Sequence, residues 1–450
     1  MKRNSGRVTG FVVGVVGLAL LVPAPVQTAQ LSSESSAPSS AAVNQVLEWN
    51  QIFIDTLIAT NTANSSSQRL GAIVHTAVFD AYNGIERRYT PIFVHSTNPH
   101  RASRRAAVVA AAHTALVGLF PSRKPALDAS YATSLAALSE QCENGRSGRR
   151  RHSCETRLER GTAWGIEVAQ AVLTWRATDG FGASYPAFNG GTAAGQWRPT
   201  PPLNGPMSAQ GLAFTEMFVL GSNTQFAPGP PRGLTSATYT DDFNAVKMLG
   251  RNTGSTRTDD QTALAAFWEG NASIHWNQAA NQLARANDLS ISDSNRLLAV
   301  LNIAMADTAF TTWAAKRFYG SVPIEVTWRP VTSIPLADTD GNPDTAPEPG
   351  WLPLINTPSH PEYPAGHPSQ NGAAATVLLS HFRQQQSFTL TTGATSRTYT
   401  SIAQARSDGN NARVWGGMHY PSTVETSDAE GEAIANYVNR NAMQRLHGGH

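Results

Sequence analysis

The chain has 450 residues, of which 15% are charged, and its formal net charge is +2. So weak a global field excludes charge-driven binding of nucleic acid or of a membrane surface. The length is compatible with about two or three domains or with one large helical core.

The first residues are typical of a secretory signal, which we assign to residues 1–29. Three basic residues precede an apolar run from Phe11 to Val22 that is too short to span a bilayer comfortably. Cleavage is expected near Ala29, with an uncleaved anchor as the alternative. Residues 30–42 are expected to form a disordered lead. No later stretch looks long and apolar enough to cross a membrane, so the protein is expected to be secreted (extracellular or periplasmic) without membrane contact after processing.

Helical periodicity dominates the rest of the chain. Apolar residues repeat at intervals of three and four over residues 46–60, 68–85, 105–120, 156–175 and 293–318. Strand-like alternation is limited to residues 322–328 and 387–392. These patterns predict an all-α fold.

Two irregular segments interrupt the helices. Residues 179–238 are rich in Gly, Pro and Trp, and residues 334–366 are rich in Pro, Asp and Gly. Long irregular segments inside a compact chain are usually functional or disordered, and the second one leads directly to His367. We predict one helical domain over residues 43–450. Its parts are N-terminal helices (43–178), the loop-rich segment (179–238) and a C-terminal half that bears the site (239–446).

Cys142 and Cys154 flank a basic run at residues 145–153. In an oxidising compartment, two cysteines that close a short loop are expected to pair, and two free thiols are the alternative. The basic run contains no aromatic residue, which favours a solvated loop over a polyanion site. Five further histidines are more typical of core or surface positions than of metal ligands: His75, His95, His100, His113 and His275.

A group of basic side chains occupies irregular, glycine-rich positions late in the chain. The group consists of Lys316, Arg329, Arg413, His367 and His419. Gly366 offers an N–H that no side chain shields, and the helix expected to start near His367 points its positive end the same way. Arginines donate paired hydrogen bonds and a lysine supplies a point charge, so the set suits a tetrahedral oxyanion. Taken singly, each residue is equally explained as structural, for example as a loop arginine in a salt bridge.

These motifs resemble the vanadium-dependent haloperoxidase and type 2 phosphatidic acid phosphatase superfamily, and its haloperoxidase-like branch in particular. The three-part signature reads here as Lys316 with Arg329-Pro330, Pro364-Ala365-Gly366-His367, and Arg413 followed by His419. Trp313, three residues before the lysine, also matches, and weaker likeness extends over residues 255–270 and 73–85. The resemblance implies a large helical bundle of the haloperoxidase and acid phosphatase type, with long irregular loops around the site.

The resemblance also implies roles for these residues. The oxygens of vanadate, or of phosphate in the same site, would be held by Lys316, Arg329, Arg413 and the N–H of Gly366. His419 would be the axial vanadium ligand or, in a phosphatase, the nucleophile. His367 would be the general acid/base. No nucleotide cofactor is implied.

Three departures from the family pattern affect this transfer. More residues separate Lys316 from Arg329 than the family usually has, so Lys247 or Arg317 are alternative cations. Ala365 replaces the signature serine, which removes a hydroxyl donor to the anion.

The third departure is Thr423, which stands where related phosphatases have an aspartate that orients the nucleophilic histidine. Other carboxylates are candidates for that task, although each also suits a surface or helix-capping position. They are Glu425, Asp428, Asp80, Asp259 and Asp260.

Two reactions and one inactive alternative follow from the resemblance. A haloperoxidase would oxidise a halide with hydrogen peroxide and pass the oxidised halogen to an organic acceptor, whereas a phosphatase would cleave a soluble phosphoester through a phosphohistidine. A degenerate, anion-binding relative without turnover is the third reading. His360 stands where bromoperoxidases of the family often have His, which favours bromide or iodide, unless it is a surface histidine. Large helical relatives often form dimers, so a homodimer is one expectation.

Overall fold

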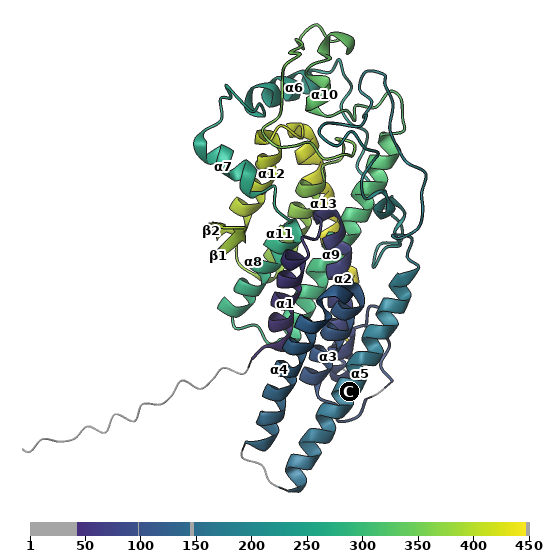
Figure 1. Cartoon of the computed structure of the whole chain (residues 1–450), viewed down its shortest axis with the longest axis vertical. Helices are drawn as coiled ribbons and strands as arrows, with labels where there is room; N and C mark the ends of the chain where they lie inside the picture. Colours follow the sequence, from purple (N-terminus) through teal and green to yellow (C-terminus); the bar gives the residue numbers. More distant parts are fainter. Residues whose placement is uncertain (1–42, 98, 145–147, 447–450) are drawn as a thin grey trace, which may run out of the picture. The chain divides into compact units, whose positions relative to one another are not determined.

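In the computed structural model, which describes residues 43–97, 99–144 and 148–446, helices form nearly all of the regular structure (Figure 1). The expected signal and the disordered lead lie outside the described residues. The longer helices are α1 (Gln45–Ala59), α2 (Asn64–Glu86), α3 (Arg104–Leu119), α4 (Lys124–Glu143), α5 (Arg149–Ala177), α6 (Ala237–Leu249), α7 (Asp259–Phe267), α8 (Ala272–Ala286), α9 (Ile291–Tyr319), α11 (Gly366–His381), α12 (Ile402–Trp415) and α13 (Pro421–Asn441). Single turns form α10 (Pro330–Ser333), η1 (Pro121–Arg123), η2 (Gln210–Phe214) and η3 (Ala337–Thr339). The all-α prediction is confirmed, and each of the five predicted helical segments lies in a helix of the structure, at most one residue beyond its end.

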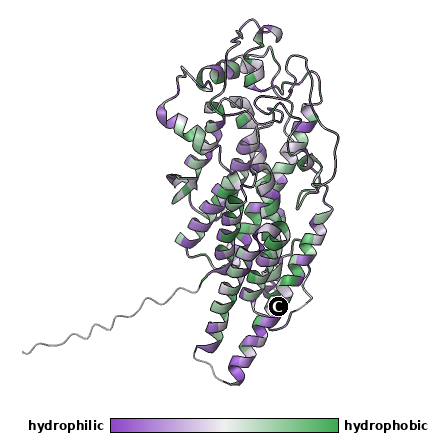
Figure 2. Ribbon diagram, in the orientation of Figure 1, coloured by the Kyte–Doolittle hydropathy of each residue, from purple (hydrophilic) through white to green (hydrophobic). Residues whose placement is uncertain are grey.

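Helix α9 is the core helix of the bundle, and it contacts α1, α2, α8, α11 and α13. Its side chains are apolar or small almost all round, so it buries every face rather than one stripe. By length and composition α9 is also apolar enough to cross a membrane. The expectation that no stretch after the signal is long and apolar enough to do so was therefore wrong. In the structure, 94% of the most apolar window of α9 is buried by other parts of the protein. Figure 2 shows apolar residues concentrated on the inner helices.

Helices α11 and α13 pack closely enough to bring their backbones into contact. A Cβ atom added to Gly372 would collide with the carbonyl oxygen of Asp428, and one added to Gly431 would collide with that of Ser369. Glycine at these two positions therefore permits the close approach. The contact fixes the start of α11 against α13, and the site lies at that start.

The only strand pair in the described part of the chain is β1 (Gln385–Thr392) with β2 (Thr395–Ser401), which are antiparallel. Residues 387–392 lie in β1, as predicted. The strand predicted at residues 322–328 is wrong, because its N–H groups bond locally or to a loop: Glu325 N–H donates to Val322 O, and Thr327 and Trp328 N–H donate to Gly195 O.

The two irregular segments contact each other near the site. Ser208 N–H donates to Ser359 O at 2.7 Å. Residues Val43–His450 cluster as one unit by their contacts. Cys142 at the end of α4 and Cys154 near the start of α5 form the expected disulfide.

Candidate functional site

A cavity of about 240 Å³ lies where α9, α11, α12 and the turn before α13 meet. Six of the residues singled out from the sequence line it: Trp313, His360, Gly366, His367, Arg413 and His419. Arg329 and Lys316 are fully buried behind its wall, and Ala365 is buried at the start of α11. The cationic and imidazole groups thus come together in one place, and their roles there stay a prediction.

The start of α11 presents free backbone donors to the cavity. Ala365 is the N-cap residue in an extended conformation, and its side chain makes no capping bond. Pro368, the third helical residue, carries no N–H, which is tolerated in a first turn. The N–H groups of Gly366 and His367 therefore form the positive end of the helix.

His367 is held as a neutral imidazole. Its Nε2 lies 3.2 Å from the carbonyl oxygen of Gly270, so Nε2 carries the hydrogen and Nδ1 keeps a lone pair. Burial, and secondarily the charge of Arg413, holds the pKa of His367 well below its usual range. The lone pair that could take part in proton transfer is therefore on Nδ1.

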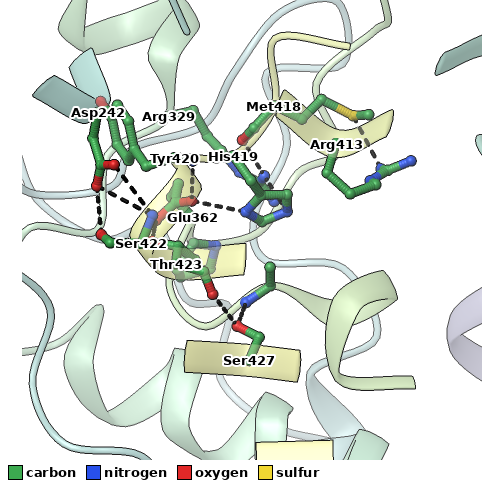
Figure 3. A network of polar contacts seen from close by, with 12 residues as sticks. Asp242, Arg329, Glu362, Arg413, Met418, His419, Tyr420, Ser422, Thr423 and Ser427 are labelled. Carbon is green, nitrogen blue, oxygen red and sulfur yellow. Dashed lines mark hydrogen bonds and ion pairs between the residues drawn. The ribbon is translucent and has the colours of Figure 1, made fainter. Parts of the chain in front are cut away.

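His419 is fixed in the opposite tautomer by two partners (Figure 3). Its Nδ1 donates to Oε1 of Glu362 at 2.8 Å, and its Nε2 accepts from Nη1 of Arg329 at 3.0 Å. Burial, with Arg329 and Lys316 nearby, holds the pKa of His419 well below its usual range. The nitrogen that carries a lone pair is thus Nε2.

Glu362 is the functional residue that the sequence analysis missed. Its carboxylate also accepts from the Tyr420 N–H at 3.1 Å and from Oγ1 of Thr423 at 3.0 Å. Burial raises the pKa of Glu362 to about 7, against the opposing effects of Arg329 and Lys316. A sequence signal existed, because Glu362 is the only acidic residue between Glu348 and Asp408.

The carboxylates considered from the sequence do not orient a histidine of the cavity. Glu425 is exposed, and Asp428 pairs with Arg406. Asp80 instead accepts three backbone N–H groups, from residues 92–94. Asp259 and Asp260 lie in the first turn of α7, where Asp260 pairs with Arg397.

Arg329 ties three segments around the cavity together. It donates through Nε to His360 O at 2.9 Å, through Nη1 to Met418 O at 2.8 Å and to His419, and through Nη2 to Nδ1 of His360 at 2.8 Å. Four of its five N–H donors are therefore engaged. Burial lowers the pKa of Arg329 to about 9.

His360 is buried, lines the cavity and packs with Trp313 at a ring-centroid distance of 5.2 Å. The alternative that it is a surface histidine is wrong. Because its Nδ1 accepts from Arg329, its ring hydrogen is on Nε2.

Lys316 stays next to the site despite its longer spacing from Arg329. Its ammonium group donates to Pro361 O at 2.6 Å and to Glu362 O at 3.2 Å, so it anchors the loop that carries Glu362. Burial, with Arg329 nearby, holds its pKa well below the usual value. The alternative cations do not replace it: Lys247 donates to Ala346 O, and Arg317 lies over the Phe188 ring.

Arg413 has the most unused donors of the three cations. Nη1 donates to Trp268 O at 3.3 Å and Nη2 to the sulfur of Met418 at 3.1 Å, whereas the buried Nε has no partner among the described residues. Burial lowers the pKa of Arg413 to about 10, so it remains a cation near neutral pH. A buried N–H without a partner costs free energy, which an anion in the cavity would relieve.

The histidines outside the cavity behave as core or surface residues. His75 and His275 are fully buried in the core, where burial lowers their pKa values to about 3 and about 4. His95 and His100 are exposed, and His113 pairs with Asp128. No group of three or more His, Cys, Asp or Glu side chains in the described ranges is arranged to hold a metal ion.

Comparison with known proteins places this site in a recognised fold. Residues 296–448, which carry most of the site, match the family described as VCPO second helical-bundle domain. A bacterial vanadium-dependent iodoperoxidase has a similar structure, with a TM-score of 0.72 and 21% identity over 90% of this chain and 98% of that one. A comparison with curated protein sequences finds no match.

Two structures of bacterial vanadium-dependent chloroperoxidase are also similar. The apo form has a TM-score of 0.61 and 15% identity over 84% of this chain and 92% of that one. The holo form has a TM-score of 0.62 and 15% identity over 90% and 94% of the two chains. The fold is that of the vanadium haloperoxidases, and the superfamily resemblance seen in the sequence is confirmed.

Proposed function

We propose that the protein is a haloperoxidase-like enzyme that oxidises a halide with hydrogen peroxide, using vanadate held against His419. The observation that carries this proposal is one cavity that is lined by both His419 and Arg413, whose guanidinium is incompletely satisfied. The similarity to solved vanadium haloperoxidases supports the same assignment.

The residues around the cavity fit a tetrahedral oxyanion. Among the described residues, three N–H donors of Arg413 have no partner, Arg329 and Lys316 have one such donor each, and the first turn of α11 adds backbone N–H groups. Among the lining residues, Glu269 is the only carboxylate, and it is exposed. Phosphate fits the same set of donors.

Each residue then has a distinct task. Bound vanadate supplies a Lewis-acidic centre that activates peroxide toward attack by a halide. His419 would ligate through Nε2, so Arg329 would have to release its bond to that atom, while Glu362 keeps Nδ1 protonated. His367 would take up or return a proton at Nδ1. The remaining cations would stabilise negative charge without rearrangement, because their neighbours already hold them in place.

We propose bromide or iodide as the halide. His360 lines the cavity beside Trp313, where its Nε2–H is free of the bond to Arg329. The similar bacterial enzyme described as an iodoperoxidase is consistent with an easily oxidised halide. Peroxide, halide and an organic acceptor are thus the proposed small-molecule partners.

Bromination of a phenol-type dye tests the proposal. The purified protein, reconstituted with vanadate, should brominate the dye with peroxide, and His419→Ala should abolish the reaction. His113→Ala is the matched control, because His113 pairs with Asp128 away from the cavity and should retain activity. Failure with bromide, iodide and chloride would refute the haloperoxidase assignment.

A phosphatase is the second candidate, and the pairing of His419 with Glu362 favours it specifically. A carboxylate on Nδ1 leaves Nε2 as a nucleophile, which would attack phosphorus while His367 protonates the leaving oxygen and later activates water. Cleavage of p-nitrophenyl phosphate without bromination would establish this reaction. Inactivity in both assays, with neither vanadate nor phosphate retained, would identify a degenerate relative.

We also propose that the protein is secreted and that it works without a membrane or nucleic acid. The disulfide between Cys142 and Cys154 supports an oxidising compartment. Fractionation of the native host would test the location, and light scattering would test the proposed homodimer.

A further inference from the structure

Met418 lines the cavity beside the histidine that the proposed reaction uses, and its thioether sulfur contacts Arg413. Its sulfur lies 3.1 Å from Nη2 of Arg413, and its carbonyl oxygen accepts from Arg329 at 2.8 Å (Figure 3). Met418 lines the cavity, but only 1% of its surface is exposed to bulk solvent. A small molecule would therefore reach the sulfur through the cavity.

The sulfur is an unusual hydrogen-bond partner for the guanidinium of Arg413. A thioether is a weak hydrogen-bond acceptor, yet here it partners the cation with the most unused donors. Thioether sulfur is also readily oxidised to the sulfoxide, which is polar and can be reduced again. Oxidation would replace a weak acceptor facing Arg413 with a strong one.

We propose that Met418 is an oxidative modification site, at which the oxidants of the cavity convert the thioether to a sulfoxide and thereby weaken anion binding. With hydrogen peroxide, an S–O bond forms as the O–O bond breaks, sulfur loses two electrons and the peroxide is reduced to water. With hypobromous acid, the same oxygen transfer releases bromide and a proton. The inference rests on the proposed function, because that reaction brings or makes these oxidants in the cavity.

The consequence for binding follows from competition for one guanidinium. A sulfoxide oxygen would bind the guanidinium of Arg413 more strongly than the thioether does and would compete with an oxyanion for the unused N–H donors. The loss of one hydrogen bond to a charged group corresponds to a fall in affinity of about tenfold or more. Oxidation at Met418 would thus reduce the retention of vanadate or phosphate.

Two other methionines provide internal controls for the route by which an oxidant reaches a methionine sulfur. Met305 in α9 is as inaccessible to bulk solvent as Met418 but does not line the cavity, whereas Met248 is 44% exposed at the end of α6. Non-specific oxidation should follow exposure, with Met248 first and the two buried residues last. Oxidation through the cavity should separate Met418 from Met305.

The test uses the full chain without vanadate, treated with graded hydrogen peroxide or with preformed hypobromous acid. Peptide mass spectrometry measures sulfoxide at each methionine, and calorimetry measures the dissociation constant of inorganic phosphate. We expect Met418 sulfoxide at doses that leave Met305 reduced, with a rise of about tenfold in the phosphate Kd that follows the Met418 sulfoxide fraction. The Kd of Met418→Leu should not change on oxidation, whereas Met248→Leu should respond as the wild type does.

Two results would overturn the inference: Met418 staying reduced at doses that oxidise Met305, or a phosphate Kd that is unchanged when Met418 is fully oxidised. If Met418→Leu does not fold, the dose series in the Met248→Leu background still decides the question. Failure of dye bromination with bromide, iodide and chloride would refute the proposed function, whereas Met418 oxidation by added reagent with a raised phosphate Kd would still support a modification site that is reached through the cavity. Active bromination with Met418 still reduced after turnover would support the proposed function and overturn the modification site.

Discussion

Glu362 and His419, 57 positions apart in the chain, are joined by a 2.8 Å hydrogen bond from Nδ1 of the imidazole to Oε1 of the carboxylate. Thr423, which replaces the aspartate of related phosphatases, donates to the other oxygen of the same carboxylate at 3.0 Å. The carboxylate that contacts His419 thus lies in the loop before α11 and not at the start of α13. His419 therefore has a carboxylate partner although position 423 carries no acid.

The first prediction concerns this carboxylate. Glu362→Gln should lower kcat for dye bromination by about 10–100-fold, because an amide is a weaker acceptor for the Nδ1–H and leaves His419 less basic. The phosphate Kd should change much less, since Glu362 does not line the cavity. Glu348→Gln, which alters a carboxylate paired with Arg251, is the matched control.

The pH profile provides a second readout for Glu362. Burial raises the pKa of this carboxyl to about 7, so it gains a proton as the pH falls through 7 and then holds His419 less firmly. The wild-type rate should therefore decline below about pH 7 more steeply than the rate of Glu362→Gln. Identical profiles for the two proteins would argue against the positioning role.

Much of the molecule followed from local sequence, because the features concerned are local. The spacing of apolar residues is enough to find α1, α2, α3, α5 and α9, because the periodicity of a helix is visible within its own segment of sequence. The same reasoning found β1 but placed a second strand at residues 322–328, which pair with no strand in the described part of the chain. A strand needs a neighbour, and its existence is a property of the tertiary fold.

In the site, too, local sequence identified some residues, whereas other contacts depend on the tertiary fold. Signature residues such as His367 and Arg413 were found because they stand at fixed positions in recognisable segments. The role of Glu362 depends on a loop returning to His419, and no spacing rule encodes that approach. The engagement of Lys316 with the carbonyl groups of Pro361 and Glu362 likewise appears only when the chain is folded.

The second prediction concerns this anchoring role of Lys316. Lys316→Met should lower the free energy of unfolding by about 1–3 kcal/mol, because two buried carbonyl groups lose their donor. Urea unfolding checks the value. Lys124→Met is the control, since Lys124 is exposed and pairs only with Asp128, and its loss should be no more than about 0.5 kcal/mol. Equal stability of Lys316→Met and wild type would show that the ammonium group does not hold the loop.

The third prediction concerns the buried histidine His75. Burial lowers its pKa to about 3, whereas in the unfolded chain it is about 6.5, so the unfolded state binds more protons between these values. The stability contribution is therefore fully present above about pH 6.5 and is lost as the pH falls, by about 2 kcal/mol at pH 5. His75→Gln should lack this loss when urea unfolding at pH 7 and pH 5 is compared with wild type.

That comparison separates the effect of His75 from that of groups whose titration changes the stability in the opposite direction. Burial raises the pKa values of Asp80 and Asp307 to about 6, so these carboxyls favour folding as the pH falls. They are present in both proteins and cancel in the difference. His95→Gln, at an exposed histidine, should keep the wild-type pH dependence. A His75→Gln profile parallel to that of wild type would show that the buried ring does not control acid stability.

The last prediction restores the hydroxyl group of the family signature. Ala365→Ser should bind phosphate about tenfold more tightly, because the new hydroxyl can donate to an anion at the start of α11. A serine at an N-cap usually turns back to the N–H of the second or third helical residue, but the third residue here is Pro368, which has none. The hydroxyl is therefore less engaged by the helix and remains available to the ligand. Calorimetry with phosphate measures the gain, and Ala337→Ser, at an equally buried alanine in η3 rather than at the start of α11, is the control. Unchanged affinity would mean that the anion does not reach the N-cap of α11, which would contradict the proposed binding mode.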